Sequence, residues 1–510
     1  MSVRKMTTLF SLAGFLFIAM PMEEVRAQEV ASYESTTVEV AGFSKKSALT
    51  DGSRSTYSAC EEIGEVTLSA EGGIYSIYIE FDRTPKAWTL TNASTGESVS
   101  CGEWGFLHEY VDVQALFGEV PASVTLQFPE GTVVADIYGF SDGEMPQWVQ
   151  TWQPPCEKAD LLLLTTHSDD EQLFFAGVLP YYAIERNLNV QVAYLVQHFE
   201  AQGVKNHVRP HEQLDGLWAV GIRNYPVMPQ FPDLYAESKD RQKAYDAAVA
   251  VYAAAGFTTE DFEEYITECL RRFKPLVVVS HDINGEYGHG GHVLGVASLM
   301  EALESAPDAE KFTESAKAYG TWQVEKTYLH LYEENPIVMD WDTPLESLGG
   351  KTPFEMTQEG FGCHESQHWT WFYKWIYGTQ ENPITKASQI RKYSPCYYGL
   401  YQTQVGVDEQ GGDFFENVVT YEERAQAALL AEQEEQARQE EAARLEALEK
   451  EQQEKEELLI KEQETIKQQE LEQELLKKQH QMQKICLAVV AIGVIMVLCL
   501  VTYLTKRKKH

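Results

Sequence analysis

The chain has few positively charged residues for its size. Its 510 residues include 41 lysines and arginines against 78 aspartates and glutamates, which gives a formal net charge of −37 at pH 7. Nucleic acid is bound through a basic surface, so this balance argues against a nucleic-acid partner. Much of the acid lies within 421–484, so the net charge describes that stretch more than the rest of the chain.

Cysteine is also scarce, with eight residues and no Cys-x-x-Cys pair that would suggest a metal cluster. Cys486 and Cys499 lie in an apolar segment near the C-terminus. The other six form an even set: Cys60, Cys101, Cys156, Cys269, Cys363 and Cys396. Nearness along the chain suggests the pairs 60–101 and 363–396, and free buried thiols are an equally good interpretation.

Proline and glycine are missing from residues 421–484, which consist almost entirely of Glu, Gln, Lys, Arg, Ala and Leu. This composition predicts a helical stalk. The apolar positions that fit a heptad seam are Leu445, Leu448, Leu459 and Ile466. Polar residues interrupt this seam, so we expect a charged single helix, or a coiled coil with weak self-association.

Residues 485–504 contain no charged side chain and are long enough to cross a bilayer as one helix. The basic residues of 505–510 follow directly, and positive charge concentrates on the cytoplasmic side of membrane spans. We therefore expect a transmembrane helix at 485–504, a basic cytoplasmic tail at 505–510, and attachment to the membrane through this span.

The N-terminal residues 1–27 have the pattern of an export signal. Arg4 and Lys5 precede the apolar run 9–20, and the small residue Ala27 offers a cleavage point. An uncleaved anchor is the alternative, but the apolar run is short for a span. Both ends together predict a single-pass protein of the cell membrane, with most of the chain outside the cell.

Residues 30–150 contain short alternating runs, such as 76–81 and 123–128, separated by Gly, Asp, Ser and Pro clusters. This pattern predicts a small antiparallel β-sandwich. The segment Leu-Thr-Asp-Gly-Ser-Arg-Ser-Thr at 49–56 resembles the opening of discoidin-like domains, which often bind glycans. A sugar-binding accessory module and a spacer without ligand both remain open.

Residues 156–420 have an α/β pattern. The apolar runs 159–164, 190–196 and 276–279 are typical of strands buried on both faces, and helical patterns lie between them. Thr258 and Asp261 form an N-cap pair before one such helix. Alternating strands and helices predict a Rossmann-like parallel sheet, in which ligands bind beyond the carboxyl ends of the strands.

Chemically active side chains follow two of these strands. The first strand leads into Thr-His-Ser-Asp-Asp-Glu at 166–171, and the last leads into Ser-His-Asp at 280–282 and then Gly-Glu-Tyr-Gly-His-Gly-Gly-His at 285–292. Either motif alone is weak evidence, because a lone His-x-x-His is usually structural and acidic runs are usually solvated. Together, at the ends of two strands, they indicate a functional site.

Zinc takes imidazole nitrogen and carboxylate oxygen, and a catalytic site uses three protein ligands with one open position. His167, Asp170 and His292 would supply these ligands. Asp169 and His289 then lie beside the metal without binding it. Asp169 is placed to act as general base toward water, and His289 to stabilise an oxyanion or protonate a leaving amine.

The sequence His-Ser-Asp-Asp-Glu at 167–171 resembles the His-Pro-Asp-Asp-Glu signature of the PIG-L (LmbE-like) deacetylases. Gly-His-Gly-Gly-His at 288–292 is similar to their second motif, His-Pro-Asp-His. The resemblance covers about 160–420, and it implies the same ligands, a zinc cofactor and removal of acetyl groups from N-acetylglucosamine-type sugars. Arg209 matches a family element in which an arginine approaches the substrate. Ser168 and the pair Gly290 and Gly291 depart from the family pattern, and neither departure changes a proposed ligand.

The aromatic stretch 369–375, Trp-Thr-Trp-Phe-Tyr-Lys-Trp, has two interpretations. Exposed rings would form a glycan cleft, because sugar rings stack on aromatic side chains. Packing of an amphipathic helix against the core is the favoured expectation, since aromatic residues are commonly interior.

The main hypothesis is a zinc-dependent extracellular deacetylase that hydrolyses the acetamide of an N-acetylated sugar or glycoconjugate. One alternative is a non-catalytic glycan-binding or adhesion surface protein whose α/β region is a degenerate deacetylase domain. Another is a stalked structural protein that gathers partners through its acidic helix.

Overall fold

The computed structural model describes residues 37–198 and 207–508. The predicted signal segment 1–27 lies outside these residues. The chain divides into two compact units, Met1–Tyr421 and Glu422–His510.

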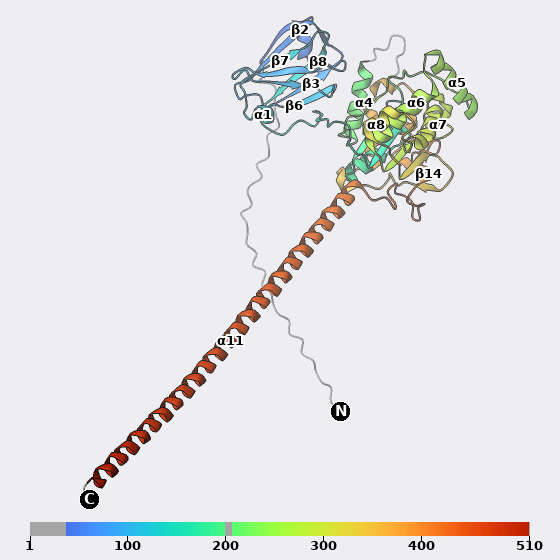
Figure 1. The fold of residues 1–510 in the computed structure, drawn as a ribbon. Helices are drawn as coiled ribbons and strands as arrows, with labels where there is room; N and C mark the ends of the chain where they lie inside the picture. Colours follow the sequence, from blue (N-terminus) through green and yellow to red (C-terminus); the bar gives the residue numbers. More distant parts are fainter. Residues whose placement is uncertain (1–36, 199–206, 509–510) are drawn as a thin grey trace, which may run out of the picture. The chain divides into compact units, whose positions relative to one another are not determined.

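The N-terminal region is built from antiparallel strands, as the alternating runs predict (Figure 1). Its elements are β1 (Thr37–Phe43), β2 (Ser58–Ser69), β3 (Ser76–Phe81), β4 (Trp88–Asn92), β5 (Ser98–Cys101), β6 (His108–Asp112), the short helix α1 (Val113–Phe117), β7 (Ser123–Phe128) and β8 (Val133–Phe140). The strand order is β5-β4-β7-β2-β8-β3-β6, with β1 paired to β2. The resemblance to discoidin-like domains stays a prediction.

A second sheet of six strands follows, in the order β10-β9-β11-β12-β14-β13. Its strands are β9 (Leu161–Thr165), β10 (Val190–Tyr194), β11 (Val277–Ser280), β12 (Lys326–His330), β13 (Pro336–Val338) and β14 (Tyr397–Thr403). The first four in the order run parallel, and β14 and β13 pair antiparallel. The three predicted apolar strands are confirmed as β9, β10 and β11.

The sheet is covered on both faces, which explains the continuous apolar runs. Leu161 and Leu163 of β9 enter one apolar cluster, and Leu162 and Leu164 enter another. Successive side chains of a strand point to opposite faces, so both faces of β9 are packed. The first cluster also contains core residues of the N-terminal strands, so the two sheets of this unit share apolar packing.

Helices connect the parallel strands and cover the sheet. They are α2 (Asp170–Leu173), α3 (Val178–Pro180), α4 (Val208–Ala219), α5 (Arg241–Ala254), α6 (Thr259–Phe273), α7 (Gly290–Ser305), α8 (Thr313–Tyr319), α9 (Pro353–Gly362) and α10 (Trp371–Tyr377). Thr258 caps α6 through the predicted pairing with Asp261. The helices α5 and α6 both pack against α7, and α7 begins at the predicted site.

The second unit is one continuous helix, α11 (Tyr421–Arg507), which has no buried residue. It joins the predicted stalk and the predicted span without a break. At about 1.5 Å per residue, a helix of this length extends about 130 Å. Its C-terminal part is long and apolar enough to cross a membrane.

The eight cysteines are all free. The suggested pairs 60–101 and 363–396 were therefore wrong, and the alternative of free thiols holds. The thiol of Cys60 donates instead to the carbonyl oxygens of Pro129 and Thr132, at 3.0 and 3.3 Å.

Candidate metal centre

The two sequence motifs meet because β9 and β11 are neighbours in the sheet. Val277 pairs with Leu161 and Val279 with Leu163, so both strands end at the same edge. His167, Asp169 and Asp170 directly follow β9, and the loop after β11 leads into the first turn of α7. Side chains from both loops can therefore share one site, as expected for the carboxyl edge of parallel strands.

Three donor atoms converge at this edge. Nδ1 of His167 lies 2.9 Å from Oδ2 of Asp170 and 3.1 Å from Nε2 of His292, and this Nε2 lies 3.2 Å from the same Asp170 oxygen. Ligands at a tetrahedral zinc ion are about 3.3 Å apart when the metal–ligand distances are close to 2 Å. The spacing of the three donors therefore fits one metal ion, and the residue types suit zinc.

The charges around these donors favour a bound cation. Burial disfavours charge on His167, but the carboxylates of Asp233 and Asp170 outweigh it and raise the pKa of this histidine well above its usual value. Burial likewise raises the pKa of Asp170, yet His292 and His167 outweigh it, and the pKa ends well below its usual value. The site thus stabilises positive charge beside an ionised carboxylate.

Two other histidines lie close enough to join a metal set, which would be His167, His289 and His292, or Asp170, His281 and His292. Nε2 of His281 accepts a hydrogen bond from the backbone N–H of Thr166 at 3.0 Å, so its lone pair is already used. Nδ1 of His289 accepts from the backbone N–H of Gly291 at 3.2 Å. The neutral His289 ring then carries its proton on Nε2. The ligand set His167, Asp170 and His292 stays a prediction, and the spacing of its donors is compatible with it.

Glu286 accepts hydrogen bonds from three histidines around the metal centre and thereby fixes their orientation. The sequence did not reveal this role. Its carboxylate has no exposed surface and lies 2.6 Å from Nδ1 of His292, 2.8 Å from Nδ1 of His281 and 2.6 Å from Nδ1 of His330. Carboxylates that accept from ligating histidines fix their tautomer and orientation. The available signal was an acid that lies between His281 and the pair His289 and His292, but His330 comes from the distant strand β12.

Asp169 has a strained backbone, with φ of 142°. This region favours glycine, and an ordinary residue there costs roughly 1–3 kcal/mol, typically at functional positions. Burial raises the pKa of its carboxyl to about 6, while the charge of Arg209 opposes the shift. Nη2 of Arg209 lies 3.7 Å from Asp169 and donates to the carbonyl oxygen of Ser168 at 2.5 Å.

Arg209 is 5% exposed, and its Nε and Nη1 have no hydrogen-bond partner among residues 37–198 and 207–508. It projects from the first turn of α4. A buried guanidinium with two unused donors beside Asp169 can bind an acceptor group. The predicted substrate-binding arginine therefore lies next to the predicted base.

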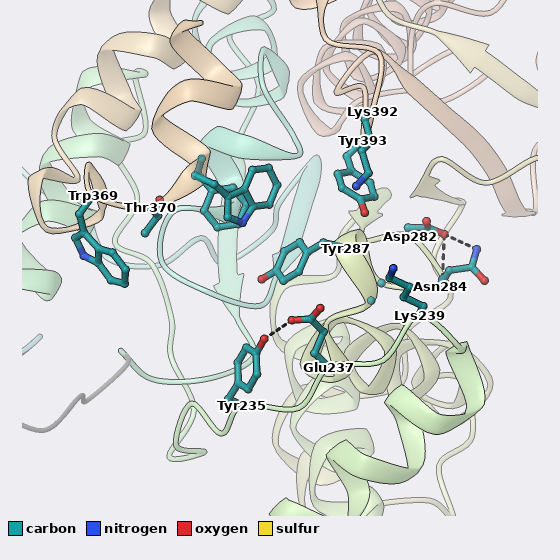
Figure 2. Close-up of a pocket in the computed structure, with 14 residues that line it drawn as sticks. Tyr235, Glu237, Lys239, Asp282, Asn284, Tyr287, Trp369, Thr370, Lys392 and Tyr393 are labelled. Carbon is teal, nitrogen blue, oxygen red and sulfur yellow. Dashed lines mark hydrogen bonds between the residues drawn. The ribbon is translucent and has the colours of Figure 1, made fainter. Parts of the chain in front are cut away.

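A cavity of about 840 Å³ (Figure 2) borders the metal centre through Tyr287, but its lining does not include the three candidate ligands, Asp169 or Arg209. The ring of Tyr287 belongs to its lining and lies 5.5 and 5.6 Å, between ring centres, from His289 and His292. The remaining lining residues are Tyr235, Glu237, Lys239, Asp282, Asn284, Gly285, Gly288, Trp369, Thr370, Trp371, Phe372, Lys392 and Tyr393. Tyr287 thus connects the cavity with the histidines.

The expectation that the aromatic stretch 369–375 packs against the core holds only in part, because Phe372 and Trp375 are partly buried against the large apolar cluster while other rings are exposed. Trp369 is 83% exposed and Trp371 is 48% exposed, and only Ile376 of α10 is buried. Both tryptophans line the cavity. The stretch thus divides between packing against the core and lining the cavity.

No protein-family model matches the chain. The chain is 33% identical over 103 residues to a mycothiol S-conjugate amidase of Streptomyces coelicolor, which covers 19% of this chain and 34% of that protein. It is 26% identical over 160 residues to 1D-myo-inositol 2-acetamido-2-deoxy-alpha-D-glucopyranoside deacetylase 2 of Saccharopolyspora erythraea, which covers 31% of this chain and 48% of that protein.

These relatives are an amidase and a deacetylase. They support a hydrolase of the deacetylase type. The chain spans only a third to a half of their lengths. Among solved structures, N,N'-diacetylchitobiose deacetylase of Pyrococcus horikoshii is 13% identical with a TM-score of 0.34, over 48% of this chain and 85% of that chain.

Proposed function

We propose that this chain is a zinc-dependent deacetylase that hydrolyses the acetamide of an N-acetylglucosamine-type sugar or glycoconjugate. The observation that carries the proposal is the convergence of His167, Asp170 and His292 to mutual donor distances of 2.9–3.2 Å. The amidase and deacetylase relatives support the reaction class.

The three residues suit zinc because they combine two imidazole nitrogens with one carboxylate oxygen and leave a fourth position free. A bound zinc ion supplies Lewis-acid polarisation of the amide carbonyl and lowers the pKa of water. Asp170 serves as the anionic ligand. His292 uses Nε2, because its Nδ1 is committed to Glu286.

Asp169 is the general base in this proposal. Its strained backbone turns the carboxylate toward Arg209, beside the three ligands. There it takes a proton from the water whose oxygen attacks the acetamide carbon. The C–N bond then breaks, acetate leaves, and the sugar nitrogen gains a proton to become an amine.

His289 acts on the carbonyl side. Burial, followed by the charges of His167 and His292, lowers the pKa of His289 well below its usual value, so the ring is neutral. Because Nδ1 accepts from Gly291, the Nε2–H is the donor. It stabilises the negative charge that develops on the carbonyl oxygen. A neutral imidazole is too weak an acid for its other predicted role, protonation of the amine, so the proton that the amine gains is the one that Asp169 took from water.

In this proposal the substrate is bound by Arg209 and by the exposed tryptophans that line the cavity, Trp369 and Trp371. The unused donors of Arg209 bind an acceptor near Asp169. Trp369 and Trp371 expose ring faces on which further sugar units can stack. An open cavity of about 840 Å³ suits an oligosaccharide or glycoconjugate better than a small amide.

We further propose that residues 485–504 of α11 cross the cell membrane once. Its basic end, at 506–509, then lies inside and the catalytic region lies outside. In this arrangement the charged part of α11 is a stalk, with self-association that is weak at most, and the substrate is an extracellular glycan.

The test is release of acetate from a panel of N-acetylated glycans by the full chain in detergent. Wild type should release acetate and free amine in equal amounts, and Asp169→Asn should release neither. A wild-type chain that cleaves no acetamide on the panel would favour the non-catalytic glycan-binding alternative.

A further inference from the structure

We propose that a second cavity of this chain binds a neutral saccharide, at a position separate from the metal centre. This cavity has a volume of about 690 Å³. The N-terminal region contributes Arg54, Ser55 and Trp148 to its lining, and α4 contributes His211, Asp215 and Trp218. The remaining lining residues are Gln147, Gln150, Val208, Glu212, Ala219, Gly362, Cys363 and Glu365.

The orientation of the Gln150 amide is set from both ends. The indole N–H of Trp152, which can only donate, lies 2.8 Å from Oε1 of Gln150. Nε2 of Gln150 lies 2.6 Å from Oδ1 of Asp215, which can only accept when ionised. Oε1 is therefore an acceptor for any further neighbour.

This orientation sets the tautomers of two stacked histidines. Nδ1 of His108 lies 2.6 Å from Oε1 of Gln150, so it must carry the proton. Nε2 of His108 lies 2.6 Å from Nδ1 of His211 and, in the neutral ring, accepts the N–H of His211. Nε2 of His211 is thereby left as an acceptor.

Both histidines are neutral, so each ring carries one N–H and His211 remains the donor to His108. They are 0% and 2% exposed. Burial lowers the pKa of His108 and of His211 well below the usual value, and the charge of Arg54 acts in the same direction. The Nε2 atom of His211 has no hydrogen-bond partner among residues 37–198 and 207–508. A buried acceptor without a donor is costly, so a ligand that supplies an O–H is favoured.

The other polar groups of the cavity also favour a ligand with many donors and no negative charge. Asp215 and Glu212 contribute carboxylates, and Glu365 lies exposed beside them. Asp215 already accepts from Arg54 and Gln150, and Glu212 already accepts from Ser366. Each of these carboxylate oxygens keeps a further lone pair for a ligand donor. The one arginine in the lining, Arg54, is already paired with Glu80 and Asp215. Among the lining residues that the structure describes, no positive charge is free to pair with an anion, whereas hydroxyl groups can donate to the carboxylates and to His211.

Tryptophan rings contribute the apolar part of a sugar site. Trp148 lines the cavity and is 43% exposed, whereas Trp218, which also lines it, has one ring face covered by the guanidinium of Arg223 at 3.8 Å from the ring centre. The negative face of an exposed indole attracts the polarised C–H groups of a pyranose face. Hydroxyl donors around an apolar face distinguish a saccharide from a peptide, whose backbone brings as many acceptors as donors.

The test is binding of the full chain, in detergent and chelator, to an array of neutral glycans that lack an acetamide group. Such glycans are not substrates of the proposed deacetylase, so binding here does not depend on that function. We expect wild type to bind at least one neutral glycan. Ser55→Trp, which fills the cavity from its exposed edge, should weaken that binding at least tenfold.

Ser100→Trp is the matched control, because Ser100 is exposed on β5 and outside the lining. It should bind as wild type does. Trp148→Ala removes a wall instead of filling the space, and it should also weaken binding if Ser55→Trp does not fold. The proposal is overturned if wild type binds no neutral glycan, if it binds only anionic ones, or if neither cavity variant changes the binding.

Discussion

Nδ1 of His292 donates a 2.6 Å hydrogen bond to the fully buried carboxylate of Glu286. A neutral imidazole carries one N–H, so this bond leaves Nε2 as a lone pair directed at Asp170 and His167. The carboxylate therefore determines which nitrogen of His292 is available to a metal.

Replacing Glu286 with Gln should weaken zinc binding by roughly 10–100-fold, the usual effect of losing such a partner. The amide has about the same size but offers one acceptor oxygen instead of two, so the three imidazoles cannot all keep their bonds. Competition with a zinc-binding dye measures the affinity. Glu310→Gln, at an exposed position, is the control. Equal zinc affinity in both variants would show that Glu286 does not support the metal ligands.

Asp169→Asn should retain zinc and lose hydrolysis by roughly 10²–10⁴-fold, because the amide cannot accept the proton of the attacking water. Bound zinc is measured by elemental analysis and hydrolysis by acetate release on the same sample. If the variant keeps full activity, Asp169 is not the base. If it loses zinc, Asp169 contributes to the metal site itself.

Trp369→Ala should raise KM for N-acetylated oligosaccharides more than for the monosaccharide. Stacking on one ring contributes about 0.5–1.5 kcal/mol, which corresponds to roughly two- to tenfold in KM. The ring is 83% exposed, so its removal should not alter the melting temperature. An equal change for both substrates would contradict a stacking role.

Asp136 gives a prediction about stability and pH. It lies buried in β8, one of its carboxylate oxygens has no partner within the described residues, and burial raises its pKa to about 6. The folded chain therefore holds this proton more tightly than the unfolded chain. Stability from this group is present below about pH 4 and is lost as the pH rises to about 6.

Asp136→Asn should abolish the decrease in folding stability that ionisation of Asp136 causes above about pH 4. The variant should match wild type near pH 4 and exceed it by roughly 1–3 kcal/mol at pH 7.5. Thermal unfolding of the full chain in detergent at both values measures the difference. Asp142→Asn, at an exposed position, should show no such divergence, and a pH-independent gain at position 136 would contradict the assignment.

The strands that position the site were predictable because local patterns encode them. The apolar run of β9 indicated burial on both faces, and the acids and histidines that follow β9 and β11 are not the residue types that core packing alone would select. The meeting of His167 and His292 followed from the rule that ligands bind at the carboxyl edge of a parallel sheet.

What could not be predicted depends on contacts between distant segments. His330 reaches Glu286 from β12, and His108 reaches His211 from the N-terminal region. No spacing along the chain encodes either contact. The exposure of Trp369 and Trp371 was mispredicted because the two environments share one composition. A short aromatic-rich segment has the same residues whether it lines a cavity or packs against the core.

The most direct test of the central claim is acetate release by the full chain after metal removal and zinc replacement. We predict that the metal-free chain is inactive on an N-acetylated glycan that wild type cleaves, and that about one zinc ion per chain restores the rate. Replacing His292 should prevent this recovery. Continued hydrolysis by the metal-free chain, or recovery without His292, would contradict the account.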